Sequence, residues 1–118
     1  MPKVLVIDDD MDILEMVQTV LSNYNFNVNC ANSATKLWES LGTHDPDVIL
    51  MDIYLGDADG RQLCLKLKTT DRYRHIPVIL YSAGNISPTS IQESLADDFI
   101  EKPFDIGLLA KKIRSFKN

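Results

Sequence analysis

Short apolar runs recur along the chain, and each leads into polar residues. They cover residues 4–7, 48–51, 78–81 and 99–100. Runs of β-branched and aliphatic residues are typical of strands that are buried on both faces, as in parallel sheets. A further segment, 26–31, alternates between apolar and polar residues, which predicts an edge strand with one more hydrated face. The pattern therefore predicts five strands, the last of them over 97–100.

The segments between these strands have apolar residues at helical spacing. The predicted helices cover 10–23, 33–41, 61–69, 87–95 and 104–116. Ser33 and Ser87 are suited to cap the second and fourth helices, and Gly42 is expected to end the second. Strict alternation of strand and helix predicts an α/β fold with right-handed crossovers and helices on both faces of one parallel sheet.

The helical spacing also predicts which side chains point inward. In the first helix the expected buried stripe is Ile13, Val17, Val20 and Tyr24. Leu14 and Met16 lie off that stripe. They are expected either to be exposed apolar groups suited to contact with a partner protein, or simply to fill the contact between the helix and the sheet. In the third helix the expected buried side is Leu63, Cys64, Leu65 and Leu67.

Length and composition restrict the kind of protein. The 118 residues fit one domain with a single core, so residues 1–118 are expected to fold as one unit. A net charge of −5 and a pI of about 4.8 lack the basic surface of a nucleic-acid binder. The sequence has neither a bilayer-length apolar stretch nor a signal-peptide pattern, so a cytoplasmic protein outside the membrane is expected.

Reactive polar residues follow four of the predicted strands at the point where each ends. They are Asp8 and Asp9, Asp52, Ser82, and Lys102. Ligands of open parallel sheets bind just beyond the carboxyl ends of the strands, where the strand order reverses. Three carboxylates, a hydroxyl and an ammonium group are therefore expected to meet in one small site.

The three carboxylates, those of Asp8, Asp9 and Asp52, predict a cation site. Clustered acids repel one another unless a cation lies between them, and a set of oxygen ligands suits a hard ion such as Mg²⁺. A solvated acidic turn that caps the first helix is the alternative, and it is the better explanation for Asp10 and Asp12. Asp8 and Asp9 directly follow a buried strand, which favours the metal site for them.

In this order and on these elements, the residues resemble one family closely: the receiver domain of two-component response regulators. The resemblance rests on Asp8-Asp9, Asp52, Gly60 eight residues later, Ser82-Ala83 and Lys102-Pro103. It covers the chain from Lys3 to about Phe116. It implies a flavodoxin-like doubly wound sandwich, with a five-stranded parallel sheet in the order 2-1-3-4-5 and five helices.

The resemblance implies a role for each site residue. Asp52 would accept a phosphoryl group, with Lys102 and Ser82 contacting the phosphoryl oxygens. Mg²⁺ would be bound directly by Asp9, by Asp52 and by the backbone carbonyl of Tyr54, and through water by Asp8. Phe99 and Ser82 would form a switch, with Phe99 as the rotating aromatic of the family. A cis peptide bond is implied between Lys102 and Pro103.

The same resemblance implies partners and a type of activity. A sensor histidine kinase or a histidine phosphotransfer protein would supply the phosphoryl group. A downstream protein, or a second copy of the chain, would bind the face formed by the fourth helix, fifth strand and last helix, including Phe104 and Ile106. The chain would be a signalling domain and not an enzyme, since it would catalyse only its own phosphorylation and dephosphorylation.

Five alternatives compete with a stand-alone switch. A phosphorelay shuttle and a receiver fragment of a larger response regulator or hybrid kinase both fit the same residues. A haloacid-dehalogenase-type phosphatase would need a second aspartate two residues after its nucleophile, where this chain has Tyr54. A flavodoxin-like FMN carrier is disfavoured because Asp8, Asp9 and Asp10 would repel its phosphate. A receiver-shaped module that is never phosphorylated is also disfavoured, since no required group is missing.

Overall fold

The computed structural model describes residues 1–43, 45–84, 86–102 and 105–116. Within these ranges the strands are β1 (Lys3–Ile7), β2 (Asn27–Ala31), β3 (Val48–Asp52), β4 (Val78–Ser82) and β5 (Asp98–Glu101). The helices are α1 (Met11–Asn23), α2 (Ala34–Thr43), α3 (Gly60–Lys68), α4 (Pro88–Glu93) and α5 (Ile106–Ser115). Pro103 and Phe104 lie outside the described residues. The expected cis peptide bond at Pro103 and the expected contact role of Phe104 therefore stay predictions.

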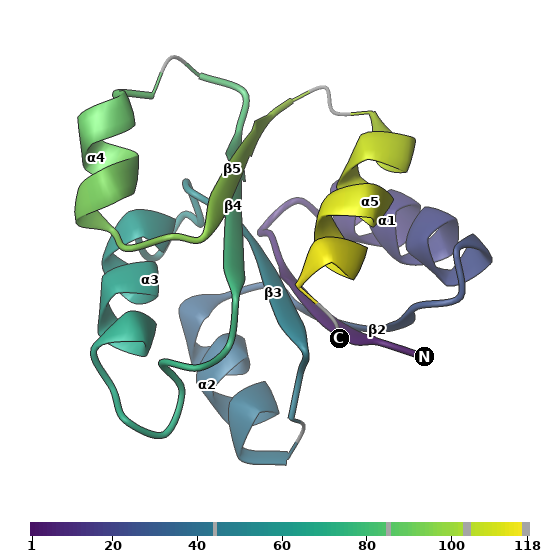
Figure 1. The fold of residues 1–118 in the computed structure, drawn as a ribbon, viewed down its shortest axis with the longest axis horizontal. Coiled ribbons are helices and arrows are strands. Elements are labelled where there is room, and N and C mark those ends of the chain that lie inside the picture. The colour runs from purple at the N-terminus through teal and green to yellow at the C-terminus, as the bar shows by residue number, and fades with distance from the viewer. Residues whose placement is uncertain (44, 85, 103–104, 117–118) are drawn as a thin grey trace.

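The five strands form one parallel sheet in the order β2-β1-β3-β4-β5. Figure 1 shows helices on both faces, with α1 and α5 on one side and α2, α3 and α4 on the other. The predicted α/β class, strand order and helix layers are confirmed. Because sequence neighbours β1 and β2 pair while β1 also pairs with β3, the chain reverses its winding direction between β1 and β3.

The central strands are buried on both faces, as their unbroken apolar runs predicted. Every residue of β3 and β4 is buried, whereas the edge strand β2 is only partly so. Alternate side chains of these strands enter two cores, one beneath α1 and α5 and one beneath α2 and α3. Full burial of each large aliphatic side chain contributes about 1.5–3 kcal/mol to folding, so the sheet is a rigid base for its carboxyl edge.

Two predictions of inward-facing side chains are wrong. The buried residues of α1 are Leu14, Val17 and Leu21, which have the predicted spacing but lie on a stripe shifted around the helix. The stripe shifts because apolar residues occupy adjacent positions on this helix, and the two leucines fill the core. Leu14 is therefore not available to a partner, whereas Met16 is exposed as predicted, together with Met11.

In α3, Leu65 is exposed, so its predicted burial is also wrong. Leu63 and Leu67 are four residues apart and Cys64 lies beside them, which places these three on one side of the helix. Leu65 points away from that side.

Helix ends differ from the predictions by at most two residues. Gly42 does not end α2, which continues to Thr43, whose hydroxyl bonds the carbonyl oxygens of Glu39 and Ser40. The helix α4 ends at Glu93, and Leu95 then has a positive φ of 64°. The predicted caps are confirmed: Ser33 Oγ accepts from the backbone N–H of Lys36, and Ser87 Oγ accepts from that of Ser90.

Candidate functional site

The carboxyl ends of β1, β3, β4 and β5 lie along one edge of the sheet, which faces the upper half of Figure 1. The parallel register pairs Ile7 with Met51, and Asp52 with Tyr81, so the chain leaves β1, β3 and β4 at nearly the same level. Asp8 and Lys102 follow β1 and β5 directly. The structure thus brings the predicted carboxylates and the predicted lysine together.

Three carboxylates form the acidic part of this site. One carboxylate oxygen from each of Asp8, Asp9 and Asp52 lies within 4.8 Å of the others. Asp8 is fully buried and Asp52 nearly so, whereas Asp9 is exposed. A cluster of oxygen ligands that is open on one side could hold a hard divalent cation, which retains several waters of its own.

Lys102 neutralises the two buried acids. Its Nζ lies 3.3 Å from Asp8 Oδ2 and 3.2 Å from Asp52 Oδ2. The backbone N–H of Lys102 donates to the carbonyl oxygen of Ser82 at 2.9 Å, which continues the pairing of β4 with β5 up to the site. One ammonium group is thus shared by two carboxylates, and Asp9 is left to face solvent.

Burial dominates the electrostatics of Asp52. Desolvation raises the pKa of this carboxyl above its usual range, and the charge of Asp8 raises it further. Lys102 and the backbone N–H of Tyr54, 3.2 Å from Asp52 Oδ1, act in the opposite direction without reversing the shift in pKa. The ionised form of Asp52 is therefore held at a cost, which a bound cation would relieve.

We expect Asp52→Asn to raise the melting temperature at neutral pH in the presence of a chelator. The folded-state pKa of Asp52 lies above its unfolded value, so the folded chain is penalised for ionising it at any pH above both values. The penalty fades as the pH falls from the folded-state pKa to the lower unfolded-state pKa, and the two melting temperatures should converge below that range. Thermal unfolding of both chains across this range is the measurement. A neutral-pH melting temperature equal to or below that of the unmodified chain would contradict the electrostatic assignment.

Tyr81 is a contact of the site that the sequence did not predict. Its hydroxyl donates to Asp8 Oδ2 at 2.7 Å, and its ring centroid lies 4.7 Å from Lys102 Nζ. Burial, followed by the charge of Asp8, raises the pKa of Tyr81 and keeps the hydroxyl protonated. In the sequence this residue was only the last member of an apolar run. The available signal was a phenol at a fully buried strand position, because a buried hydroxyl needs a partner.

The other predicted site residues lie around this centre. Ser82 is buried at the end of β4, and its Oγ accepts from the backbone N–H of Gly84 at 3.3 Å. Tyr54 lies at the rim with an exposed side chain, and the guanidinium of Arg61 is 5.8 Å from its ring centroid. Phe99, on β5, is half-buried and packs against the core beneath α2 and α3.

Gly60 fits the site for a steric reason. A Cβ at this position would collide with the backbone carbonyl oxygen of Asp52 and would lie 3.0 Å from Ile53 Cα. The backbone N–H of Gly60 donates to the carbonyl oxygen of Ile53 at 2.6 Å. The first turn of α3 therefore packs directly on the end of β3, which explains a glycine eight residues after Asp52.

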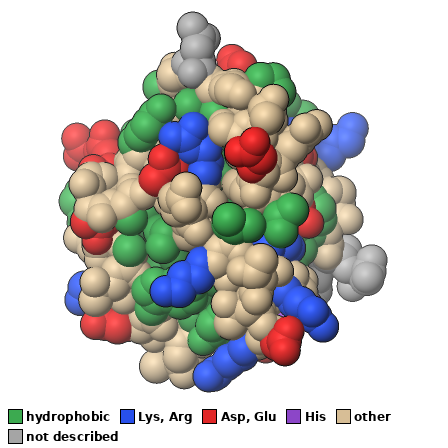
Figure 2. Space-filling view, turned by 90° about the vertical axis from the view of Figure 1, so that its left-hand side faces the viewer, with side chains coloured by type: hydrophobic (Ala, Val, Ile, Leu, Met, Phe, Trp, Pro, Cys, Tyr) green, Lys and Arg blue, Asp and Glu red, His purple; other side chains and the backbone are tan. Residues whose placement is uncertain are grey.

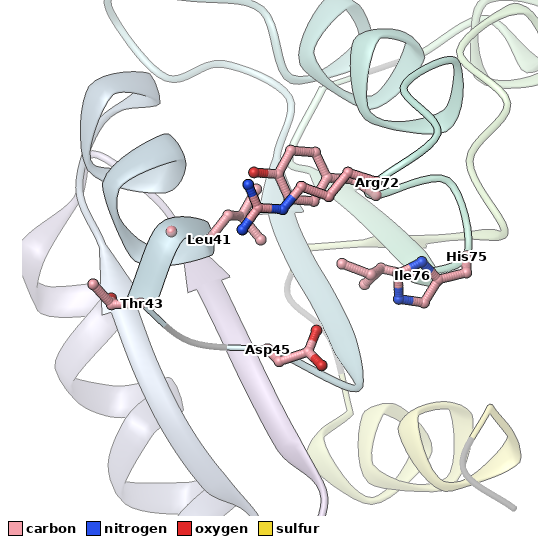
Figure 3. Close-up of a pocket in the computed structure, with 8 residues that line it drawn as sticks. Leu41, Thr43, Asp45, Arg72, His75 and Ile76 are labelled. Atoms are coloured by element: carbon pink, nitrogen blue, oxygen red, sulfur yellow. The ribbon is translucent and has the colours of Figure 1, made fainter.

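A separate pocket lies at the opposite edge of the sheet. Figure 3 shows it between the end of α2 and the segment before β4, with Leu41, Asp45, Arg72 and His75 around a space of about 430 Å³. The carboxylates at the strand ends contribute nothing to it.

Among the helices in the described ranges, none combines the length and apolar character required to cross a bilayer.

Comparison with known proteins agrees with this arrangement. The family model described as "Response regulator receiver domain" matches residues 4–114. The transcriptional regulatory protein KdpE of Staphylococcus aureus is 36% identical over 95% of the chain, and the DNA-binding regulator RpaA of Synechocystis is 32% identical over 98%. The chain spans about half the length of these relatives, 48% of each.

One solved structure resembles this chain over nearly the whole length of both. The receiver domain of the Francisella response regulator 1452 superimposes with a TM-score of 0.88, at 29% identity, covering 98% of this chain and 96% of that one. With the family match over residues 4–114, the chain belongs to the response regulator receiver domain family.

Proposed function

We propose that the chain is a phosphorylation-dependent switch in which Asp52 accepts a phosphoryl group beside a bound Mg²⁺. The observation that carries this proposal is the position of Asp52, which belongs to the three-carboxylate cluster and also lies 3.2 Å from Lys102 Nζ. Among the described residues, Asp8 also belongs to this cluster and also contacts Lys102. Asp8 is fully buried, whereas Asp52 keeps some exposure through which a phosphoryl donor can approach.

The donor set fits Mg²⁺. Asp9 and Asp52 would hold the ion directly with the backbone carbonyl of Tyr54, and Asp8 would act through water. When bound, the ion would neutralise charge on the phosphoryl oxygens. The exposed Asp9 carboxylate leaves the outer side of the cluster open to water and to a donor phosphate.

The chain's own residues would do the rest. A carboxylate oxygen of Asp52 would form a bond to phosphorus while the bond from phosphorus to the donor breaks, and the donor leaves with that electron pair. The ammonium group of Lys102, which contacts Asp8 and Asp52 in this structure, would move to bind the phosphoryl oxygens. Ser82 would give a hydroxyl hydrogen bond to a phosphoryl oxygen, which requires its Oγ to turn away from Gly84.

We assign the donor to the histidine-phosphorylating proteins of two-component systems. Receiver domains interact with histidine kinases, and the finer choice between a sensor kinase and a phosphotransfer protein is part of this proposal. Because the chain spans about half of its curated relatives, a role as a shuttle or as the receiver portion of a larger regulator is the second candidate.

The output surface would be formed by α4, β5 and α5. A phosphoryl group on Asp52 would carry about −1.5 to −2 charge, in place of the single charge of the free carboxylate. Movement of Ser82 toward it would vacate space for the half-buried Phe99 ring, a change in packing that reaches the surface. Figure 2, which views the side where α3 and α4 lie, shows apolar side chains and both charges intermixed. Leu95 and Leu108 add exposed apolar area after α4 and on α5, suited to a protein target or to a second copy.

Beryllofluoride, which mimics a bound phosphoryl group, should shift the backbone amide resonances of residues 83–102 when Mg²⁺ is present. The displaced Ser82 and Phe99 side chains change the surroundings of β5 and of the segment before α4. The measurement is a pair of amide correlation spectra, with sedimentation to detect a dimer. Full switching from 1:99 to 99:1 would need about 5.5 kcal/mol, so intermediate shifts are expected. Unchanged resonances in this segment would contradict the proposed output.

The experiment for the function itself is incubation with acetyl phosphate and Mg²⁺ followed by intact mass measurement. One phosphoryl group per chain is expected, and none without Mg²⁺. A chain that stays unlabelled with both reagents present would refute the proposal.

A further inference from the structure

Tyr81 contacts both Asp8 and Lys102, the two charged residues beside Asp52, from the core side of the sheet edge. It lies near the end of β4, fully buried in the core beneath α1 and α5. Its hydroxyl is 2.7 Å from Asp8 Oδ2 and 3.4 Å from the carbonyl oxygen of Ile7. The shorter bond, to a charged acceptor, is the stronger one. The ring lies under the Lys102 ammonium, with 4.7 Å between Nζ and the centroid.

The two oxygens of Asp8 have different partners. Oδ1 accepts from the backbone N–H of Asp10 at 2.9 Å, and Oδ2 accepts from both Tyr81 and Lys102. The backbone donor and the phenol are fixed by α1 and β4. Of these three partners of Asp8, only Lys102 has a long, flexible side chain. Its ammonium group also contacts Asp52.

A phosphoryl group on Asp52 would draw Lys102 away from Asp8. A fully buried carboxylate that loses one donor is strongly destabilised unless another donor remains. Tyr81 supplies that donor, and it cannot follow the phosphoryl group because its ring is packed in the core.

We propose that Tyr81 is a positioning residue that holds Asp8 through its hydroxyl and thereby frees Lys102 for the phosphoryl group on Asp52. This inference rests on the proposed function of Asp52. It assigns to β4 a second contribution to the site besides Ser82. Without the hydroxyl, Asp8 would compete for the ammonium group, and Lys102 would reach the phosphoryl oxygens less often.

The test is Tyr81→Phe, which removes the hydroxyl and keeps the ring under Lys102. Labelling by acetyl phosphate with saturating Mg²⁺ is expected to slow by about tenfold, the effect of one hydrogen bond to a charged group. Mg²⁺ affinity should stay within about threefold, since Asp8 would act on the ion only through water. Tyr24→Phe is the matched control, because Tyr24 packs against the same core at the far end of α1. It should label at the unmodified rate.

A second variant separates the hydrogen bond from the packing. With 4-fluorophenylalanine at position 81, the space of the hydroxyl is filled but no proton is donated, so labelling should be as slow as in Tyr81→Phe. It also replaces Tyr81→Phe if that chain fails to fold. A labelling rate within twofold of the unmodified chain would overturn the inference. So would a parallel loss of labelling, Mg²⁺ affinity and melting temperature, which would indicate a structural role. Absence of labelling in the unmodified chain would instead refute the function of Asp52.

Discussion

Asp9→Ala is expected to weaken Mg²⁺ binding by at least about tenfold. Asp9 is the exposed member of the carboxylate cluster, and among the described residues Lys102 pairs with Asp8 and Asp52 but not with Asp9. Losing a direct carboxylate ligand removes both a coordinating oxygen and a negative charge from a site that Mg²⁺ occupies with few protein ligands. Changing a residue that only hydrogen-bonds to a directly coordinating ligand already costs roughly 10–100-fold in affinity, so the loss of the direct ligand itself should cost at least as much. A titration followed by amide resonances or by intrinsic fluorescence measures the affinity.

Asp12→Ala is the matched control for that titration. Asp12 is an exposed acid in the first turn of α1 and changes the net charge by the same amount, but it is not in the cluster. Its variant should bind Mg²⁺ within about twofold of the unmodified chain. Equal losses in the two variants would mean that the ion responds to overall charge, and an unchanged affinity in Asp9→Ala would place the ion elsewhere.

Lys102→Met is expected to slow labelling by acetyl phosphate by roughly 10²–10³-fold, the usual effect of removing one preorganised donor from a reacting oxyanion. Methionine keeps an unbranched apolar stem and removes the charge that lies 3.2 Å from Asp52 Oδ2. Without that charge, a negative nucleophile and a negative phosphoryl group repel each other and Mg²⁺ alone offsets the repulsion. The rate of mass gain measures the effect.

Lys68→Met provides the comparison for this lysine. Lys68 is buried to a similar extent and pairs with Asp97 at 2.9 Å, on the α3 side of the sheet and away from the carboxylate cluster. Its variant should lose stability but label at nearly the unmodified rate. If both variants slowed equally, the loss would reflect weakened folding, and Lys102 would have no particular role in phosphoryl transfer.

The strands were predictable because burial on both faces leaves little choice of residue type. The runs that became β3 and β4 are continuous and each begins with two β-branched residues, and their ends fixed the edge on which Asp52 and Ser82 lie. Helix orientation was less predictable. In α1 the adjacent residues Ile13 and Leu14 are both apolar, so periodicity alone allowed two stripes, and packing against the sheet chose the one with Leu14.

The candidate site was predictable where a polar side chain follows a strand, and not where it lies within one. Asp8 and Lys102 interrupt the apolar pattern at strand ends and were expected to meet. Tyr81 belongs to the run itself, so its hydroxyl was hidden by the hydrophobic character of its ring. Only the pairing of β4 with β3, and of β3 with β1, places that hydroxyl next to Asp8.

The phosphoryl acceptor can be located directly by intact mass after incubation with acetyl phosphate and Mg²⁺, comparing the unmodified chain with Asp52→Asn. Asparagine keeps the size of the side chain and removes the nucleophilic carboxylate. The unmodified chain should gain one phosphoryl group and the variant none, while Asp12→Ala, tested alongside, should label normally. Labelling of Asp52→Asn at the unmodified rate would contradict the assignment of Asp52 as the acceptor.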